Sequence, residues 1–264
     1  MRVAAIQMTP EFGQIERNRE RAAALIECAE SDLAVLPEMA FTGYCFASRA
    51  EAAEAAETAE GSSVRRMTEL SKRLNTIICF GFPERSSGLI YNSAALVGPA
   101  GLIAVYRKIH LFNDEKDLFA PGPTPFFAVR AGAATVGMMI CFDWFFPEAA
   151  RSLALAGAQI ILHPANLILA YCQEAMVTRC LENRVFAVTA NRGGQEQPHG
   201  KTITFTGQSQ ITRPDGSYER LPDRKDGILV ADIDTQRADD KSVTDKNHVW
   251  RDRRPELYFQ REKE

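Results

Sequence analysis

The feature of this sequence that most restricts its fold is a series of short apolar segments separated by amphipathic stretches. Residues 2–8 and 32–36 are mostly apolar, and residues 22–29 between them repeat apolar side chains at the i, i+3, i+4 and i+7 spacing of a helix. Strands that are apolar along their length are typical of sheets covered on both faces. The order strand, helix, strand therefore predicts an α/β chain in which helices cover the sheets.

The rest of the chain repeats this alternation. By the same patterns, helices are expected at residues 49–60, 63–74, 147–157 and 172–185. Strands are expected at residues 76–82, 89–97, 102–107, 134–140, 159–163, 186–190, 208–212 and 227–233. Turn residues at 98–101 predict a hairpin, and the polar stretch 108–125 predicts an irregular loop. No linker, repeat or low-complexity segment divides the sequence, so residues 1–264 are expected to form one domain.

Charge and hydropathy exclude several classes of protein. The formal net charge is −3, so no excess of positive charge draws the chain to nucleic acid or to an anionic membrane. No apolar run reaches the roughly 18 residues of a membrane-spanning helix, and the first residues lack the longer apolar region of a signal peptide. We therefore expect a cytoplasmic protein with no nucleic-acid or membrane partner.

The six cysteines do not form a recognisable framework. There is no C-x-x-C pair and no cluster of Cys and His at zinc spacing. Most of these thiols are expected to be small buried apolar side chains, and neither a metal nor a cofactor is expected.

The C-terminal tail, residues 239–264, combines many charges with large apolar side chains. These side chains are Val249, Trp250, Leu257, Tyr258 and Phe259. Aromatic residues in a polar tail indicate that the tail docks on another surface. We expect that surface to belong to a neighbouring subunit.

Three reactive side chains each follow an expected strand. Glu38 follows residues 32–36, Lys108 follows residues 102–107, and Cys141 follows residues 134–140. In open α/β sheets, ligands bind outside the carboxyl ends of the strands, where loops converge. The three side chains are therefore candidates for one shared site.

The chemistry of these three groups is complementary. A free thiol has a pKa of about 8.5, so Cys141 needs a base, and Glu38 is suited to take its proton and return it to a leaving nitrogen. The ammonium of Lys108 would offset the carboxylate charge and face an oxyanion, together with the backbone N–H of Phe142. Each residue also has a simpler interpretation when it is taken singly. Cys141 is consistent with a packed core thiol, Glu38 with a solvated loop carboxylate, and Lys108 with a basic surface turn.

Three sequence blocks carry a resemblance to a known family. They are LPEMAFTGY at residues 36–44, YRKIHLF at residues 106–112 and ICFDWFFPE at residues 140–148. In this order, and each with its reactive residue, they resemble the nitrilase superfamily of carbon–nitrogen hydrolases. The resemblance extends from the first strand to residues 253–258.

The resemblance implies a fold and a set of catalytic residues. The fold is a four-layer α-β-β-α sandwich, and catalysis proceeds through Glu38, Lys108 and Cys141 with a covalent thioester. The family also carries a second glutamate soon after the lysine. Glu115 fits that position, with Asp114 and Asp117 as neighbouring alternatives. Its implied role is to place Lys108 and the substrate, or to assist the water that releases the acyl group.

Several further residues are candidates for substrate contact. Tyr44 and Phe112 are interpreted as pocket walls, although ordinary core packing fits them as well, and Trp144 and Asn166 are placed near the nucleophile by the same resemblance. Many relatives carry Arg where this chain has Phe145, so the substrate specificity of those relatives is not transferred. The aromatic run after Cys141 indicates a compact apolar pocket suited to short or hydrophobic amides.

The function implied is hydrolysis of a small-molecule amide by water to a carboxylic acid and ammonia. Hydrolysis of a carbamoyl amide or of a nitrile would use the same residues, and a non-catalytic binding protein is the alternative from another class. The resemblance also implies a homodimer or a larger homo-oligomer.

Overall fold

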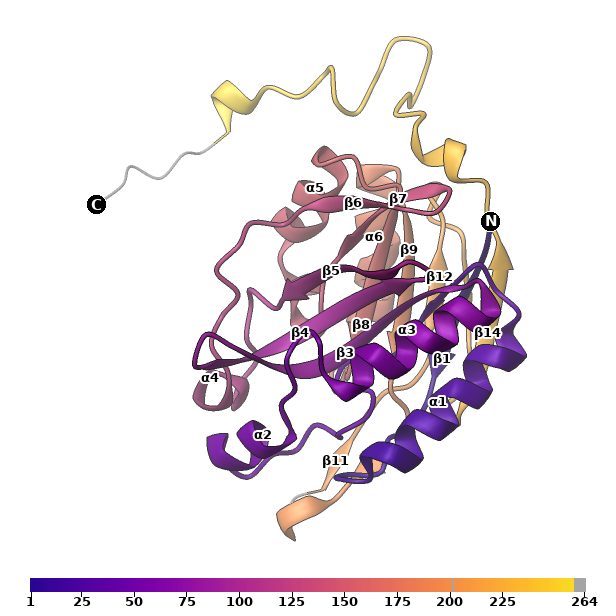
Figure 1. The fold of residues 1–264 in the computed structure, drawn as a ribbon. Coiled ribbons are helices and arrows are strands. Elements are labelled where there is room, and N and C mark those ends of the chain that lie inside the picture. Colours follow the sequence, from indigo (N-terminus) through magenta and orange to yellow (C-terminus); the bar gives the residue numbers. More distant parts are fainter. Residues whose placement is uncertain (201, 259–264) are drawn as a thin grey trace.

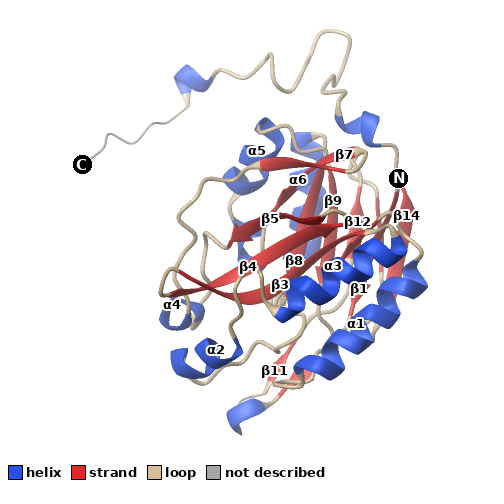
Figure 2. Ribbon diagram, in the orientation of Figure 1, coloured by secondary structure: helices blue, strands red, loops and turns tan. Residues whose placement is uncertain are grey.

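The computed structural model describes residues 1–200 and 202–258, and two six-stranded sheets form its centre (Figure 1, Figure 2). In order across the first sheet, the strands are β14 (Gly227–Asp232), β1 (Arg2–Gln7), β2 (Leu33–Val35), β3 (Ile77–Ser86), β4 (Leu89–Gly98) and β5 (Gly101–Arg107). β2 pairs in parallel with β1 and β3, and the other neighbours pair antiparallel. β5 therefore runs in the same direction as β2 and β3, and their carboxyl ends share one edge.

The second sheet repeats this mixture of parallel and antiparallel pairs. In order across it, the strands are β13 (Tyr218–Arg220), β12 (Gln210–Thr212), β9 (Phe186–Asn191), β8 (Ile160–Ala165), β7 (Ala134–Met138) and β6 (Ala128–Ala131). β7, β8 and β9 are parallel, and the outer pairs are antiparallel. A separate two-stranded ribbon joins β10 (Gln195–Glu196) to β11 (Ile203–Thr204).

Helices cover the outer face of each sheet. α1 (Ile15–Ala29) and α3 (Ser62–Leu74) pack on the first sheet, and α5 (Pro147–Leu155) and α6 (Cys172–Asn183) pack on the second. The shorter helices are α2 (Arg49–Ala55), α4 (Glu115–Leu118) and the 3-10 turns η1 (Cys141–Phe145), η2 (Pro198–Gly200), η3 (Thr235–Ala238) and η4 (Pro255–Leu257). The arrangement confirms the predicted four-layer α-β-β-α sandwich.

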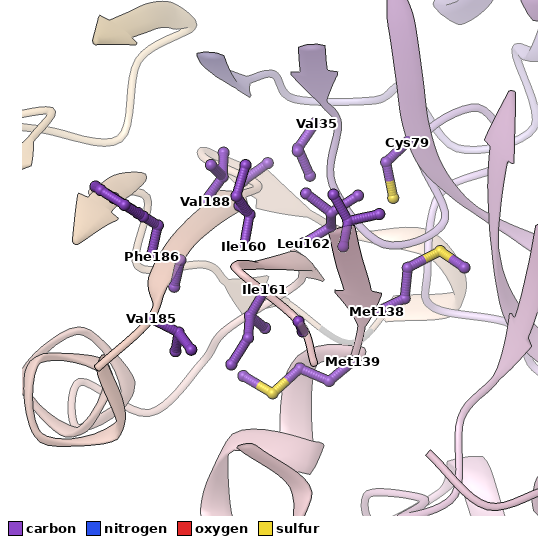
Figure 3. Close-up of a cluster of buried hydrophobic side chains, with 14 of the residues drawn as sticks. Val35, Cys79, Met138, Met139, Ile160, Ile161, Leu162, Val185, Phe186 and Val188 are labelled. Atoms are coloured by element: carbon purple, nitrogen blue, oxygen red, sulfur yellow. The ribbon is translucent and has the colours of Figure 1, made fainter. Parts of the chain in front are cut away.

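The inner faces of the two sheets bury a continuous apolar core. Figure 3 shows Val35 and Cys79 of the first sheet extending toward Leu162 of the second. Ile161, the neighbour of Leu162, extends the opposite way, because successive side chains of a strand alternate between faces. β8 therefore contributes both to the core between the sheets and to the layer under α5 and α6, which explains its lack of a polar face.

Some expected boundaries differ from the structure. The helix expected at 49–60 ends at Ala55, because the backbone of Glu57 instead forms an isolated parallel β-bridge with Glu84 of β3. Pairing with the sheet overrides the helix propensity of this Ala- and Glu-rich stretch. α4 lies inside the expected loop 108–125, and β6, β10, β11 and β13 were not predicted. The hairpin at residues 98–101 is present between β4 and β5.

The tail beyond β14 follows the surface and then leaves the body of the molecule (Figure 1). Trp250 is partly buried, with the guanidinium of Arg151 in α5 lying 5.0 Å from its ring centroid. Leu257 and Tyr258 are exposed, and Phe259 lies outside the described residues. Within residues 1–200 and 202–258, no helix combines the length and the hydropathy of a membrane span.

Candidate active site

Glu38 lies three residues after the end of β2, where the chain turns away from the first sheet. The segment is held against β3, because Leu36 N–H donates to the carbonyl of Cys79 and Ala40 N–H donates to that of Gly81. A Cβ at Gly81 would lie 2.5 Å from Glu38 Cα, so only glycine allows the two backbones to approach this closely. The side chain of Glu38 is consequently fully buried.

Lys108 joins Glu38 to Glu115 in one buried cluster. Its Nζ donates to Glu38 Oε1 and to Glu115 Oε1, both at 2.8 Å, and none of the three side chains is more than 1% exposed. Lys108 follows β5, and its backbone N–H donates to the carbonyl of Asn92 in β4. A single ammonium thus faces two carboxylates, and all three groups are buried.

The two oxygens of Glu38 have different surroundings. Oε1 accepts from Lys108 and also from Asn92 Nδ2 at 2.6 Å. Oε2 is buried and has no hydrogen-bond partner among the described residues. One oxygen therefore anchors the carboxylate, and the other keeps its lone pairs free to accept a proton.

Cys141 begins the 3-10 turn η1, three residues after the end of β7. Its φ is 41°, which is the left-handed region that residues other than glycine rarely occupy. Asp143 braces the turn, because its Oδ2 accepts from Ile140 N–H at 2.9 Å and its own N–H donates to the carbonyl of Ile140 at 3.0 Å. Tyr106 and His110 in turn hold the Asp143 carboxylate.

The charges of the cluster set the protonation states. Burial raises the pKa of the Cys141 thiol well above its ordinary value; Glu38 raises it further, and Lys108 opposes that rise. Burial also raises the pKa of Glu38, against the effect of Lys108. Burial disfavours the Lys108 ammonium, but Glu115 and Glu38 outweigh it and raise the Lys108 pKa. At rest, the site combines a neutral thiol with a firmly protonated amine.

Six of the residues singled out in the sequence line one small cavity. They are Tyr44, Phe112, Cys141, Phe142, Trp144 and Asn166, joined by the unpredicted Leu167, Ile168 and Leu169. Apart from Cys141 and Asn166, this lining is aromatic or aliphatic. The Phe145 side chain is 53% exposed and is not among these lining residues.

Asn166 supplies the polar group of this cavity. Its side chain is 3% exposed, and neither Oδ1 nor Nδ2 has a hydrogen-bond partner in the described part of the chain. Its backbone N–H also donates toward the Cys141 thiol, which lowers the thiol pKa and partly offsets burial. An amide side chain with both ends free beside a nucleophile can bind an incoming amide group.

Tyr44 links the cavity to the buried charges. Its hydroxyl donates to Glu115 Oε1 at 2.6 Å, and Phe112 N–H donates to Glu115 Oε2 at 3.0 Å. The loop that carries Tyr44 is held by Glu196, whose carboxylate accepts from the backbone N–H of Tyr44 at 2.9 Å and forms a buried ion pair with Arg192.

Several residues of this site were not found from the sequence. Asn92, Asp143, His163 and Glu196 are all at most 5% exposed and contact the reactive residues or the segments that carry them. The available signal was a polar side chain inside an apolar segment, as with Asn92 in residues 89–97 and His163 in residues 159–163.

The remaining thiols lie elsewhere. Cys28 is exposed, and Cys79, Cys172 and Cys180 are buried. In residues 1–200 and 202–258, no group of three His, Cys, Asp or Glu side chains is arranged to hold a metal ion.

Comparison with known proteins places this chain in a family. The sequence model described as carbon-nitrogen hydrolase matches residues 2–241. A Pyrococcus abyssi protein named nitrilase is 41% identical over 98% of this chain and 99% of its own length. An N-carbamoylputrescine amidase of Oryza sativa subsp. japonica is 34% identical over 97% of this chain and 92% of its own.

A solved structure agrees with the sequence matches. The crystal structure of a carbon-nitrogen hydrolase from Helicobacter pylori G27 is similar with a TM-score of 0.87 and 25% identity, covering 98% of this chain and 96% of that one. The resemblance drawn from the three sequence blocks is thereby confirmed. The chain belongs to the carbon-nitrogen hydrolase family of the nitrilase superfamily.

Proposed function

We propose that this protein is an amidase that hydrolyses a small amide to a carboxylic acid and ammonia through a thioester on Cys141. The observation that carries the proposal is the free Oε2 of Glu38, held by Lys108 and Asn92 in a buried cluster whose charges act on the Cys141 thiol. A thiol that is neutral at rest requires a base, and this carboxylate can serve as that base because no hydrogen bond from the described residues competes for its Oε2.

In the first half of the reaction, the Cys141 sulfur attacks the amide carbon as its proton passes to Glu38. The oxygen of the substrate then carries a negative charge, which the Lys108 ammonium and the Phe142 N–H stabilise in this proposal. Collapse of this intermediate breaks the carbon–nitrogen bond. Glu38 gives its proton to the departing nitrogen, ammonia leaves, and the acyl group remains on sulfur.

In the second half, water attacks the thioester carbon and gives a proton to Glu38. The carbon–sulfur bond breaks, the acid is released, and the sulfur regains its proton from Glu38. Glu115 supports both halves by holding Lys108 and accepting from Tyr44. The free amide of Asn166 is proposed to orient the substrate amide, and the apolar walls favour short or hydrophobic acyl groups.

Ammonia release from a panel of short aliphatic, aromatic and carbamoyl amides tests this proposal. The wild type is expected to release ammonia from at least one of them and to show an acyl mass increase on Cys141 in the intact protein. Cys141→Ala is expected to abolish both signals. A protein that forms no adduct and releases no ammonia from any member of the panel would instead be a binding protein.

The names of the relatives support two rival substrates. N-carbamoylputrescine amidase names a carbamoyl substrate, and nitrilase names a nitrile. Release of carbon dioxide together with ammonia would identify carbamoyl hydrolysis, and acid formation from a nitrile panel would identify nitrile hydrolysis. Glu38, Lys108, Glu115 and Cys141 would act in either reaction.

We also propose that the protein is a homo-oligomer. Several large apolar side chains of η1, α5, α6 and the tail are exposed, namely Phe145, Leu155, Leu181, Leu257 and Tyr258. Their exposure supports a subunit contact at this end of the molecule, where the tail also extends away from the body (Figure 1).

A further inference from the structure

The peptide bond between Cys141 and Phe142 has an unusual position in this site. It carries the nucleophile on one side and the proposed oxyanion donor, Phe142 N–H, on the other. Cys141 has a φ of 41°, a conformation that persists only where the surroundings determine it. Among the described residues, no acceptor is recorded for Phe142 N–H, and Phe142 lines the cavity beside Cys141.

The carbonyl of the same peptide is held by a buried histidine. His163, in β8, places Nε2 at 3.0 Å from the carbonyl oxygen of Cys141 and Nδ1 at 3.1 Å from Thr189 Oγ1 of β9. A carbonyl oxygen only accepts, so Nε2 must carry the hydrogen. Nδ1 of a neutral ring then accepts from the Thr189 hydroxyl, which fixes the tautomer.

The ring remains neutral because of its surroundings. His163 is 0% exposed, and burial lowers its pKa to about 4, although the Cys141 carbonyl and Asp143 favour the charged form. The ring is therefore a single, fixed N–H donor under ordinary conditions. It does not itself exchange protons with the substrate.

Planarity connects this hydrogen bond to the reaction. The C=O and N–H of a trans peptide point in opposite directions, so a donor that fixes the Cys141 carbonyl also fixes the direction of Phe142 N–H. Asp143 fixes the preceding residue through Ile140 N–H. His163, in contrast, donates a hydrogen bond to the Cys141–Phe142 peptide itself.

We propose that His163 is a positioning residue for oxyanion stabilisation, which holds the Cys141–Phe142 peptide with its N–H directed into the cavity, and that Thr189 selects the histidine tautomer for this task. The inference rests on the proposed hydrolysis through Cys141. It assigns to His163 of β8 and Thr189 of β9 a part in transition-state stabilisation. Both act through the Cys141–Phe142 peptide and not by contact with the substrate.

The test separates the direction of the N–H from the reactivity of the thiol. His163→Phe keeps a flat ring and removes the donor, whereas His163→Gln keeps an N–H donor on a side chain of similar reach. For His163→Phe, kcat is expected to fall by about 10²-fold with little change in KM, because one oxyanion donor is misdirected. His163→Gln is expected to recover part of this loss.

Modification of Cys141 by methyl methanethiosulfonate is the second measurement. The thiol attacks sulfur in this reagent, so no oxyanion forms on carbon. The rate at Cys141, followed by peptide mass mapping, is expected to be the same in His163→Phe as in the wild type. Parallel loss of kcat and of modification rate would overturn the proposal, because it would indicate general damage to the site.

Thr189→Val provides a test that does not alter the histidine. It is expected to lower kcat roughly five-fold, as for the loss of one neutral hydrogen bond. Thr212→Val is the matched control, since this buried threonine lies on the neighbouring strand β12 and accepts from Gln210. Wild-type kcat in His163→Phe, or equal losses in Thr189→Val and Thr212→Val, would overturn the proposal. Absence of amide turnover in the wild type would refute the proposed function instead.

Discussion

Lys108 is the residue on which the charge balance of the site depends. It is the ammonium that contacts both Glu38 and Glu115, and all three side chains are buried. Two carboxylates without this cation would face each other in a medium of low dielectric, where like charges repel strongly. The same ammonium is the proposed partner of the negative charge that develops on the substrate. One change at Lys108 is therefore expected to alter both the stability of the fold and the rate of the reaction.

Replacement of Lys108 by alanine should affect both activity and stability. Loss of an oxyanion partner is expected to lower kcat by about 10²–10³-fold. Leaving two buried carboxylates unpaired is expected to lower the free energy of unfolding by about 3–5 kcal/mol. Lys116→Ala, at an exposed position of α4, is the matched control for steady-state kinetics and urea unfolding. Near-normal kcat in Lys108→Ala would remove this residue from the mechanism.

The protonation of Glu38 should set the acid side of the pH profile. Burial raises its pKa above the ordinary value of 4.5, and the hydrogen bond from Asn92 lowers it. Only the ionised carboxylate can take the thiol proton, so kcat/KM is expected to fall as the pH decreases through this raised pKa. Asn92→Leu removes a stabilising donor and should move the acid limb to higher pH.

Ser93→Ala is the control for this pH measurement. Its hydroxyl donates to Glu84 rather than to Glu38, so the acid limb should stay where it is in the wild type. An acid limb that is unchanged in Asn92→Leu would mean that Glu38 does not govern it.

At the level of elements, the site depends on how closely β3 approaches the segment after β2. Gly81 has no side chain, and its backbone exchanges hydrogen bonds with the Pro37–Ala40 segment around Glu38. The carboxylate is thus positioned by two adjacent parallel strands rather than by a free loop. This explains how a buried acid can be held in one orientation.

Gly81→Ala should displace that segment. The added methyl group would meet Glu38 Cα at 2.5 Å, and relief of such a contact is expected to cost about 1–3 kcal/mol of stability. Because the shift moves Glu38, kcat should fall as well. Gly98→Ala is the control, since its methyl group would meet only the flexible end of Ile103. Thermal unfolding and kinetics of both variants would show whether the loss is specific to Gly81.

The helices and strands of this fold differ in how well the sequence predicts them. The long strands and the amphipathic helices were predicted because each has a clear apolar pattern. β10, β11 and β13 are only two or three residues long, which is too short for a period to be visible. Glu38, Lys108 and Cys141 were predicted as reactive residues from their chemistry and from the family blocks. Asn92 and His163 were missed because their role depends on contacts with Glu38 and Cys141, 54 and 22 residues away.

At the scale of the whole molecule, the site joins the two halves of the sandwich. Glu38 and Lys108 follow strands of the first sheet, and Cys141 and Asn166 follow strands of the second. The apolar core between the sheets therefore fixes the distance between acid, amine and thiol (Figure 3). Any change that lets the sheets slide should reduce activity before it unfolds the chain.

Removal of the tail tests the proposed oligomer. A chain that ends before Trp250 loses the partly buried indole beside Arg151 and the exposed Leu257 and Tyr258. Light scattering is expected to show a smaller particle than for the full chain. Removal of residues 259–264 alone is the matched control. An unchanged particle mass after the longer truncation would count against docking of the tail on another subunit.

The raised pKa of Cys141 has a consequence outside catalysis. Peroxide and similar oxidants react with thiolates far faster than with thiols, and oxidation beyond the sulfenic acid is generally irreversible. A sulfur that keeps its proton until a substrate arrives is shielded from this damage between encounters, whereas Cys28 is exposed at the surface. Burial is therefore expected to slow the oxidation of the Cys141 thiol relative to that of Cys28.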